Sequence, residues 1–288
     1  MKVFLPDGRV LRYWSSATPG PVVLFFHGTP DSRRIAMTGN HAATEVGVRL
    51  LTFNRPGYGS STPTASTFTS VADDAATLLD LWGIEEVAVL GMSVGGPYAA
   101  AFAATYPDRA TALGLVSAPA MTETSDDTVE QAMARLSPEF MAWRARIDPD
   151  DEDDAALAGR FLAELPPADA AALRGMLAEV AQVLDYGSDV ELAAGMAWDA
   201  LVEPQGYLRD AALLLRTWDF DPEAVACPVR LWCGDQDEKA LSAATWWADR
   251  LPQAQVDVLP DTTHLAALLT RWPEILRWLA DGPGTARD

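Results

Sequence analysis

Short hydrophobic runs alternate with amphipathic stretches along the first third of the chain. The hydrophobic runs are mostly apolar, and 22–26 and 87–90 are apolar throughout, which is typical of strands buried on both faces of a sheet. They lie at 22–26, 48–53, 87–90 and 112–116. Segments with helical spacing separate or follow them, at about 33–46, 70–83 and 94–105. Strands that alternate with helices predict a parallel sheet with helices on both sides.

The two ends of the chain add further strands to this pattern. Residues 3–5 and 9–14 flank the turn Pro6-Asp7-Gly8, which predicts a β-hairpin. The alternation returns after about residue 218. The last predicted strands are 228–233 and 255–259, and the last predicted helices are 240–251 and 265–280.

Between these parts, the segment from about 121 to 217 contains no convincing strand. It is rich in Ala, Leu, Asp and Glu at helical spacing, interrupted by prolines. We therefore predict one α/β core, formed by 1–120 and 218–288, with a helical cap inserted at 121–217. The dense acidic run at 148–154 is interpreted as a solvated loop and helix start rather than a metal site.

The composition narrows the possible partners. The 288 residues include 41 acidic and 21 basic side chains, for a formal net charge of −20. Such a charge disfavours nucleic acids, anionic membranes and polyanionic substrates. We find no signal-peptide pattern and no apolar run long enough for a membrane span. The only cysteines, Cys227 and Cys233, are expected roughly 20 Å apart along an extended chain. Two reduced thiols fit a cytoplasmic protein, and we expect a monomer or homodimer that binds a small molecule.

The strongest chemical signal is Gly91-Met-Ser93-Val94-Gly95, between a predicted strand and a predicted helix. In this setting, G-x-S-x-G predicts a tight turn that presents the serine hydroxyl above the carboxyl edge of the sheet. Small residues two positions away avoid a clash. The backbone N–H of Val94 can then stabilise an oxyanion. We interpret Ser93 as a nucleophile, the alternative being a glycine-rich turn that merely packs.

A second signal is His27-Gly28-Thr29-Pro30, directly after the strand at 22–26. A glycine at this point lets the loop fold close to the nucleophile. The backbone N–H of Thr29 is then placed to be the second oxyanion donor. We expect His27 to tie down this loop rather than to act as the base.

A serine nucleophile needs a base, and the chain has three histidines. His41 falls inside a predicted helix, as a surface residue would. His264 follows the last predicted strand, at the edge where ligands gather in open α/β sheets, and it is the predicted base. The orienting carboxylate is Asp235 or Asp237. We favour Asp237, because the earlier position usually shapes the turn and the later one points toward the histidine.

These motifs resemble the α/β-hydrolase superfamily, and within it the lid-bearing serine hydrolases. The resemblance spans nearly the whole chain. It rests on His-Gly-Thr-Pro at 27–30, Arg-Pro-Gly-Tyr-Gly at 55–59, Gly-Met-Ser-Val-Gly-Gly at 91–96, Gly-Asp-Gln-Asp at 234–237 and the late His264.

This resemblance implies a mainly parallel eight-stranded sheet with a helical cap inserted after the sixth strand. It also implies a Ser93, Asp237 and His264 triad, an oxyanion hole of the Thr29 and Val94 backbone N–H groups, and no metal or organic cofactor. Two features depart from the family pattern. Asn54 replaces the Asp that often precedes Arg-Pro-Gly, and the apolar-Pro pair that commonly follows the acid is missing after Asp237.

The expected reaction is hydrolysis of a carboxylic ester, lactone or thioester of a small to medium hydrophobic acid. A serine nucleophile argues against dehalogenase and epoxide hydrolase chemistry, which in this family uses a carboxylate nucleophile. The alternatives are a perhydrolase, a carbon–carbon hydrolase, a lyase or a cyclase on the same scaffold, or a ligand-binding protein that retains the triad. Large aromatic residues are expected to line an apolar pocket, although core packing is the commoner role of any one of them. The pocket candidates are Phe140, Trp143, Trp198 and Trp218.

Overall fold

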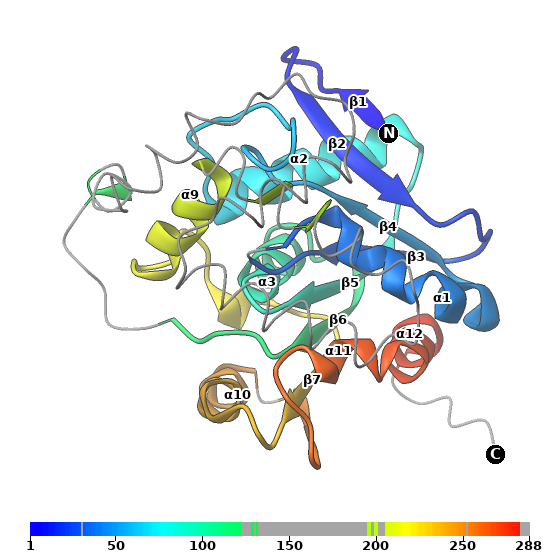
Figure 1. Ribbon diagram of the computed structural model, residues 1–288, viewed down its shortest axis with the longest axis vertical. Helices are drawn as coiled ribbons and strands as arrows, with labels where there is room; N and C mark the ends of the chain where they lie inside the picture. Colours follow the sequence, from blue (N-terminus) through cyan, green and yellow to red (C-terminus); the bar gives the residue numbers. More distant parts are fainter. Residues whose placement is uncertain are drawn as a thin grey trace.

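A single eight-stranded sheet organises the protein (Figure 1). The computed structural model describes residues 1–29, 31–121, 128, 129, 131, 195, 196, 199, 200, 205–251 and 253–282. The strand order is β1-β2-β4-β3-β5-β6-β7-β8, in which β2 is antiparallel to both of its neighbours and the strands from β4 to β8 are parallel. This arrangement confirms the predicted α/β class and the mainly parallel sheet. The strands are β1 (Lys2–Phe4), β2 (Val10–Ser15), β3 (Val22–Phe26), β4 (Arg49–Phe53), β5 (Val87–Met92), β6 (Ala110–Val116), β7 (Val229–Gly234) and β8 (Gln255–Leu259).

The burial of each strand follows its position in the sheet. Every residue of the central strand β5 is buried, which explains its uninterrupted apolar sequence. The edge strand β8 is largely exposed, with only Leu259 buried. At the other edge, Gly8 takes a φ of 89° in the turn between β1 and β2, a conformation that a glycine adopts without steric cost.

Helices cover both faces of the sheet and create two separate cores. One core contains side chains of α2 (Phe68–Leu81), α3 (Gly95–Thr105) and α10 (Glu238–Arg250). The other contains side chains of α1 (Asn40–Val46), α11 (Ala266–Leu269) and α12 (Trp272–Asp281), and Figure 1 shows α1 beside α12. The remaining described helices are the 3-10 helices η1 (Arg33–Gly39) and η2 (Pro222–Ala224), and α9 (Gln205–Leu214).

Two of the predicted helices are divided in the structure. The segment expected as one helix over 33–46 begins as the 3-10 helix η1 and continues as α1. The segment expected over 265–280 is split into α11 and α12 around Thr270 and Arg271. Pro273 explains the second break, because a residue without an N–H fits the first turn of a new helix better than the interior of a longer one.

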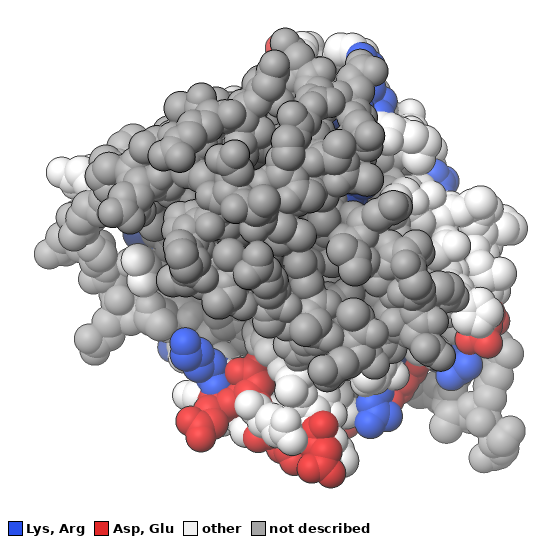
Figure 2. All heavy atoms as spheres, viewed as in Figure 1, with Lys and Arg blue, Asp and Glu red and all other residues white. Residues whose placement is uncertain are grey.

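Only part of the predicted cap lies within the described residues. Helix α9 and the described positions between 195 and 200 belong to it, whereas Phe140, Trp143 and Trp198 lie outside the described residues. The boundaries of 121–217 therefore stay a prediction. On the face shown in Figure 2, acidic side chains gather along the edge of the molecule that carries α10, with basic side chains among them.

Candidate active site

The parallel strands end at one edge of the sheet, and the candidate residues follow these ends. The register pairs Phe26 with Gly91, Met92 with Val116, and Gly234 with Leu259, so neighbouring strands finish at similar heights. Loops that leave this edge are where ligands bind in open α/β sheets. They carry His27 after β3, Ser93 after β5, Ser117 after β6, Asp237 after β7 and His264 after β8.

Ser93 lies in a strained turn between β5 and α3. Its φ is 50°, in the left-handed region that costs a non-glycine residue roughly 1–2 kcal/mol. The turn is closed so tightly that a Cβ at position 91 would lie 2.5 Å from the Gly95 oxygen, and one at position 95 would lie 2.1 Å from the Phe26 oxygen. Only glycine fits at both positions, which is the steric reason for the G-x-S-x-G pattern.

The loop after β3 lies directly against this turn. A Cβ added to Gly28 would be 3.3 Å from the Ser93 Cβ. Val94 forms the N-cap of α3. Within the described part of the chain, the backbone N–H groups of Thr29 and Val94 have no hydrogen-bond acceptor. Two donors without acceptors beside a serine are suited to hold a negatively charged oxygen.

Asp237 and His264 are in direct contact. Asp237 Oδ2 is hydrogen-bonded to His264 Nδ1, and Asp237 Oδ1 accepts a hydrogen bond of 3.0 Å from the Ala240 N–H as the N-cap of α10. Asp235 is used elsewhere, since its Oδ1 accepts a 3.1 Å hydrogen bond from the Thr262 N–H. Of the two carboxylates that the sequence left open, Asp237 is therefore the one in contact with the His264 ring.

The environment of Asp237 favours its ionised form. Partial burial opposes ionisation and would raise the pKa of Asp237. This effect is outweighed by hydrogen bonds from His264 and from the backbone N–H groups of Ala240 and Lys239, and by the charge of His264. The pKa of Asp237 is therefore lowered. The Asp237 side chain is 10% exposed, whereas that of His264 is 46% exposed. A fixed carboxylate below an accessible imidazole is the arrangement that a general base requires.

Ser93 and His264 are both connected to the end of β6. The Ser93 N–H donates to the Val116 oxygen at 2.8 Å, and the next residue, Ser117, donates its hydroxyl to the His264 backbone oxygen at 3.1 Å. Among the described contacts there is no hydrogen bond between the Ser93 hydroxyl and the His264 ring. Without a substrate such bonds are often long, and they tighten when the reacting complex forms.

His27 is a buried, neutral residue that holds its loop. Its Nδ1 donates to the Gly28 oxygen at 2.8 Å, and its Nε2 accepts from the Arg55 N–H at 3.4 Å. Burial, and next the positive charge of Arg55, keep the pKa of His27 well below 6.5. His41, in contrast, is 82% exposed on α1 beside Glu45, so neither histidine is placed to serve Ser93.

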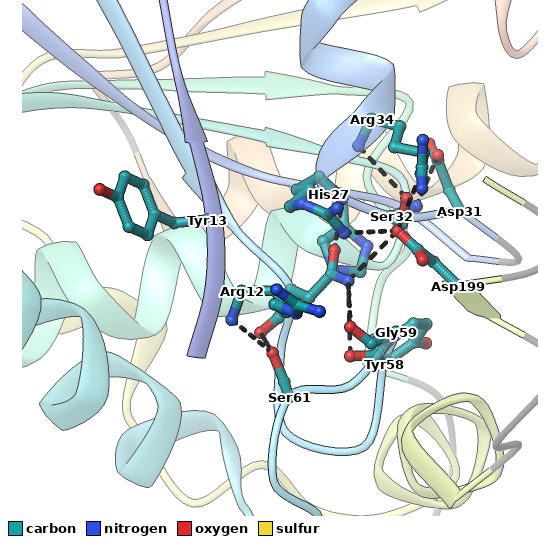
Figure 3. Close-up of polar contacts among 12 residues, drawn as sticks. Arg12, Tyr13, His27, Asp31, Ser32, Arg34, Tyr58, Gly59, Ser61 and Asp199 are labelled. Atoms are coloured by element: carbon teal, nitrogen blue, oxygen red, sulfur yellow. Dashed lines mark hydrogen bonds and ion pairs between the residues drawn. The ribbon is translucent and has the colours of Figure 1, made fainter. Parts of the chain in front are cut away.

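Asn54 has a structural explanation in Asp199, a buried residue of the predicted cap. Asn54 Oδ1 accepts from the Arg33 N–H at 2.8 Å, while its Nδ2 donates to Asp199 Oδ2 at 3.3 Å. Arg33 pairs with the same carboxylate at 2.5 Å, and Figure 3 shows Asp199 between Arg34, at the start of η1, and Gly59. An aspartate at position 54 would place a second carboxylate against Asp199. The amide instead both accepts and donates.

Trp218 packs within the core. It is 5% exposed and lies against a group of aromatic rings on the α2 and α10 side of the sheet. The described contacts of Trp218 therefore support the packing role rather than the pocket role. The rings are those of Phe68, Phe220, Trp246 and Trp247.

We predict that Asp31, in the loop between β3 and η1, makes the stability of the protein depend on pH. Burial raises its pKa from 3.8 to about 7, despite a hydrogen bond from the Ser32 N–H. The folded protein thus retains a proton that the unfolded chain releases between about pH 4 and 7. The free energy of unfolding of the wild type, relative to Asp31→Asn, should fall as the pH rises through this window. The fall is about 4 kcal/mol at most, since one pKa unit corresponds to about 1.4 kcal/mol.

Urea denaturation of both proteins at several pH values between about 4.5 and 7.5 measures this difference. The asparagine side chain of the variant does not titrate, so other titrating groups cancel in the comparison. A difference that is constant, or that grows in favour of the wild type with rising pH, would contradict the prediction.

Comparison with known proteins assigns the family. A family model described as the alpha/beta hydrolase fold matches residues 21–269, so the chain belongs to the α/β-hydrolase fold family. A related protein, pimeloyl-[acyl-carrier protein] methyl ester esterase of Chromobacterium violaceum, is 30% identical over 268 residues, which cover 91% of this chain and 94% of the relative.

Solved structures show the same fold. A thermophilic esterase from Thermogutta terrifontis has a TM-score of 0.63 at 23% identity, covering 96% of this chain and 94% of its own. The enol-lactonase from Burkholderia xenovorans also has a TM-score of 0.63, at 18% identity, covering 96% of this chain and 99% of its own. Within the described residues, no helix is long and apolar enough to cross a membrane. The same residues contain no group of three His, Cys, Asp or Glu side chains arranged to hold a metal ion.

Proposed function

We propose that this protein is a serine esterase that cleaves a carboxylic ester, lactone or thioester of a small to medium hydrophobic acid. The observation that carries the proposal is the Asp237–His264 pair at the sheet edge where Ser93 occupies its strained turn. The name of the Chromobacterium violaceum relative, a methyl ester esterase, supports an ester as the substrate. The formal charge of −20 favours uncharged or weakly charged substrates over polyanions.

In the proposed reaction, the Ser93 oxygen attacks the carbonyl carbon while His264 Nε2 takes the hydroxyl proton. Negative charge moves to the carbonyl oxygen, which accepts hydrogen bonds from the Thr29 and Val94 N–H groups. One such donor typically contributes about 3 kcal/mol. The carbon–oxygen bond to the alcohol then breaks, or the carbon–sulfur bond in a thioester, and His264 returns its proton to the leaving group. In the second half of the reaction, His264 takes a proton from a water molecule, whose oxygen attacks the acyl carbon. The bond to the Ser93 oxygen then breaks, the acid leaves, and His264 returns the proton to Ser93.

Asp237 has a separate task in this scheme. Its Oδ2 holds the proton of His264 on Nδ1, which leaves Nε2 free to accept the proton of Ser93. The lowered pKa of Asp237 keeps the carboxylate charged when the imidazolium forms. The Asp237 carboxylate is therefore suited to stabilise the imidazolium form of His264.

A panel of p-nitrophenyl esters of increasing acyl length, with covalent labelling by a fluorophosphonate, tests this proposal. We expect turnover of short and medium acyl esters, and labelling that mass spectrometry assigns to Ser93. Labelling at Ser93 without turnover of any ester, lactone or thioester would favour the non-hydrolytic alternatives. Labelling at another residue, or turnover without labelling, would overturn the assignment of the nucleophile.

A further inference from the structure

One buried carboxylate, Asp210 on α9, gathers four hydrogen bonds from three side chains. Arg55 donates to Asp210 Oδ2 from Nε at 3.2 Å and from Nη2 at 2.5 Å. The Tyr58 hydroxyl donates to the same oxygen at 2.6 Å, and the Tyr98 hydroxyl donates to Oδ1 at 2.6 Å. Asp210 is 2% exposed and Arg55 is 1% exposed. Removing two charges so completely from water is costly, which makes each hydrogen bond in the group important.

The partners of Asp210 hold three consecutive residues of the loop after β3. Arg55 Nη1 donates to the His27 oxygen at 2.5 Å, and Nη2 donates to the Gly28 oxygen at 3.1 Å. The Thr29 hydroxyl lies 2.8 Å from the Tyr58 hydroxyl. Because Tyr58 uses its proton on Asp210, Thr29 is the donor in that pair. The three residues that lead to and include Thr29 are thus held by side chains that are themselves bound to Asp210.

The other oxygen of Asp210, Oδ1, binds a side chain of the helix that carries the second proposed oxyanion donor. Tyr98 lies on α3, the helix whose N-cap is Val94. Through Tyr98, the same carboxylate is tied to the element that presents the Val94 N–H. A single side chain from the predicted cap therefore connects the two elements that must hold their N–H groups in fixed relative positions.

We propose that Asp210 and Arg55 are positioning residues for the oxyanion hole, acting through Tyr58 and Tyr98 on the Thr29 and Val94 N–H groups. This inference rests on the proposed esterase function. An oxyanion donor displaced by even about 1 Å loses much of its effect on the rate. We expect Asp210→Asn to lower kcat/KM for an ester by about 10- to 100-fold, mainly through kcat.

The test compares p-nitrophenyl butyrate with its thionoester, in which sulfur replaces the carbonyl oxygen. Sulfur accepts hydrogen bonds poorly, so the thionoester gains less from the two N–H donors. Displacing the donors should slow the ester more than the thionoester. The ratio of their kcat/KM values should therefore fall by about tenfold in Asp210→Asn. A loss of folded protein would lower both rates equally and leave the ratio unchanged.

Two further variants make the outcome decisive. Tyr58→Phe removes only the hydroxyl that connects Thr29 to Asp210, and it should lower the same ratio even if Asp210→Asn fails to fold. Asp74→Asn is the matched control. Asp74 is another buried carboxylate paired with an arginine, Arg9, at 2.5 Å, but that arginine belongs to the N-terminal hairpin. Its variant should lose stability and keep the wild-type ratio.

An unchanged ratio in Tyr58→Phe, and in Asp210→Asn where it folds, would overturn the inference even if turnover still depended on Ser93. Turnover that survives Ser93→Ala would instead overturn the proposed function. A ratio that falls equally in Asp74→Asn would show that the effect is not specific to Asp210, and would also overturn the inference.

Discussion

Replacing Ser93 with alanine is expected to lower kcat/KM for p-nitrophenyl butyrate by about 10⁴- to 10⁶-fold. Alanine has no hydroxyl, so no acyl-enzyme can form, and the residual rate reflects only binding and the two N–H donors. The strained backbone at position 93 persists, with its φ of 50°. The fold should therefore survive, which circular dichroism and thermal denaturation can verify alongside the kinetics.

Ser60→Ala provides a matched control for this variant. Ser60 is also a serine in the left-handed region, with a φ of 63°, and it is exposed. The same substitution there meets the same backbone strain but should leave the ester rate unchanged. If Ser93→Ala keeps a rate comparable with that of Ser60→Ala, Ser93 is not the nucleophile.

The second large effect is expected for Asp237→Asn, which should lower kcat by about 10⁴-fold. The N-cap of α10 determines how the new amide is oriented. Its oxygen replaces Asp237 Oδ1 as the acceptor for the Ala240 N–H, so its NH₂ group faces His264 Nδ1. Nδ1 must then accept a hydrogen bond, the ring proton moves to Nε2, and the base can no longer take the proton of Ser93.

Asp235→Asn separates this effect from the loss of any nearby charge. Asp235 follows the same strand, but it accepts a hydrogen bond from the Thr262 N–H rather than from His264. We expect a loss of less than about tenfold, because the loop around His264 keeps its main contacts. Steady-state kinetics of both variants with one ester is sufficient. A larger loss in Asp235→Asn than in Asp237→Asn would reverse the assignment of the acid.

The sheet and the strand-end residues could be predicted because their signals are local. An apolar run such as 22–26 or 87–90 indicates a strand that is buried on both faces of the sheet. The glycines around Ser93 indicate a turn so tight that it leaves no room for a Cβ atom at their positions. The choice between Asp235 and Asp237 requires the three-dimensional structure. The two lie two positions apart in one loop, and only their hydrogen-bond partners, in the segment 262–264, distinguish them.

The buried acids of the predicted cap could not be recognised from sequence. Asp199 and Asp210 lie in a stretch rich in Ala, Leu, Asp and Glu, where an acidic residue at helical spacing is usually solvated. Their partners lie more than 100 positions away along the chain. The one clue in the sequence is Arg55, which lies two residues after the end of the buried strand β4. A guanidinium at such a place requires a buried counter-charge, but nothing local says which of the 41 acidic residues supplies it.

The pairing of Arg55 with Asp210 also limits how the predicted cap can be exchanged or removed without disturbing the α/β core. Exchanging or deleting an insertion is a common way to change the specificity of an enzyme while keeping its scaffold. Here such an excision through α9 would leave a guanidinium that is 1% exposed without its carboxylate, in contact with the loop after β3. Asp199, which precedes α9, pairs in the same way with Arg33 of the core. A graft that keeps both Asp199 and Asp210 in the scaffold should avoid that penalty, so we expect an exchange to succeed when it ends before Asp199 rather than at residue 217.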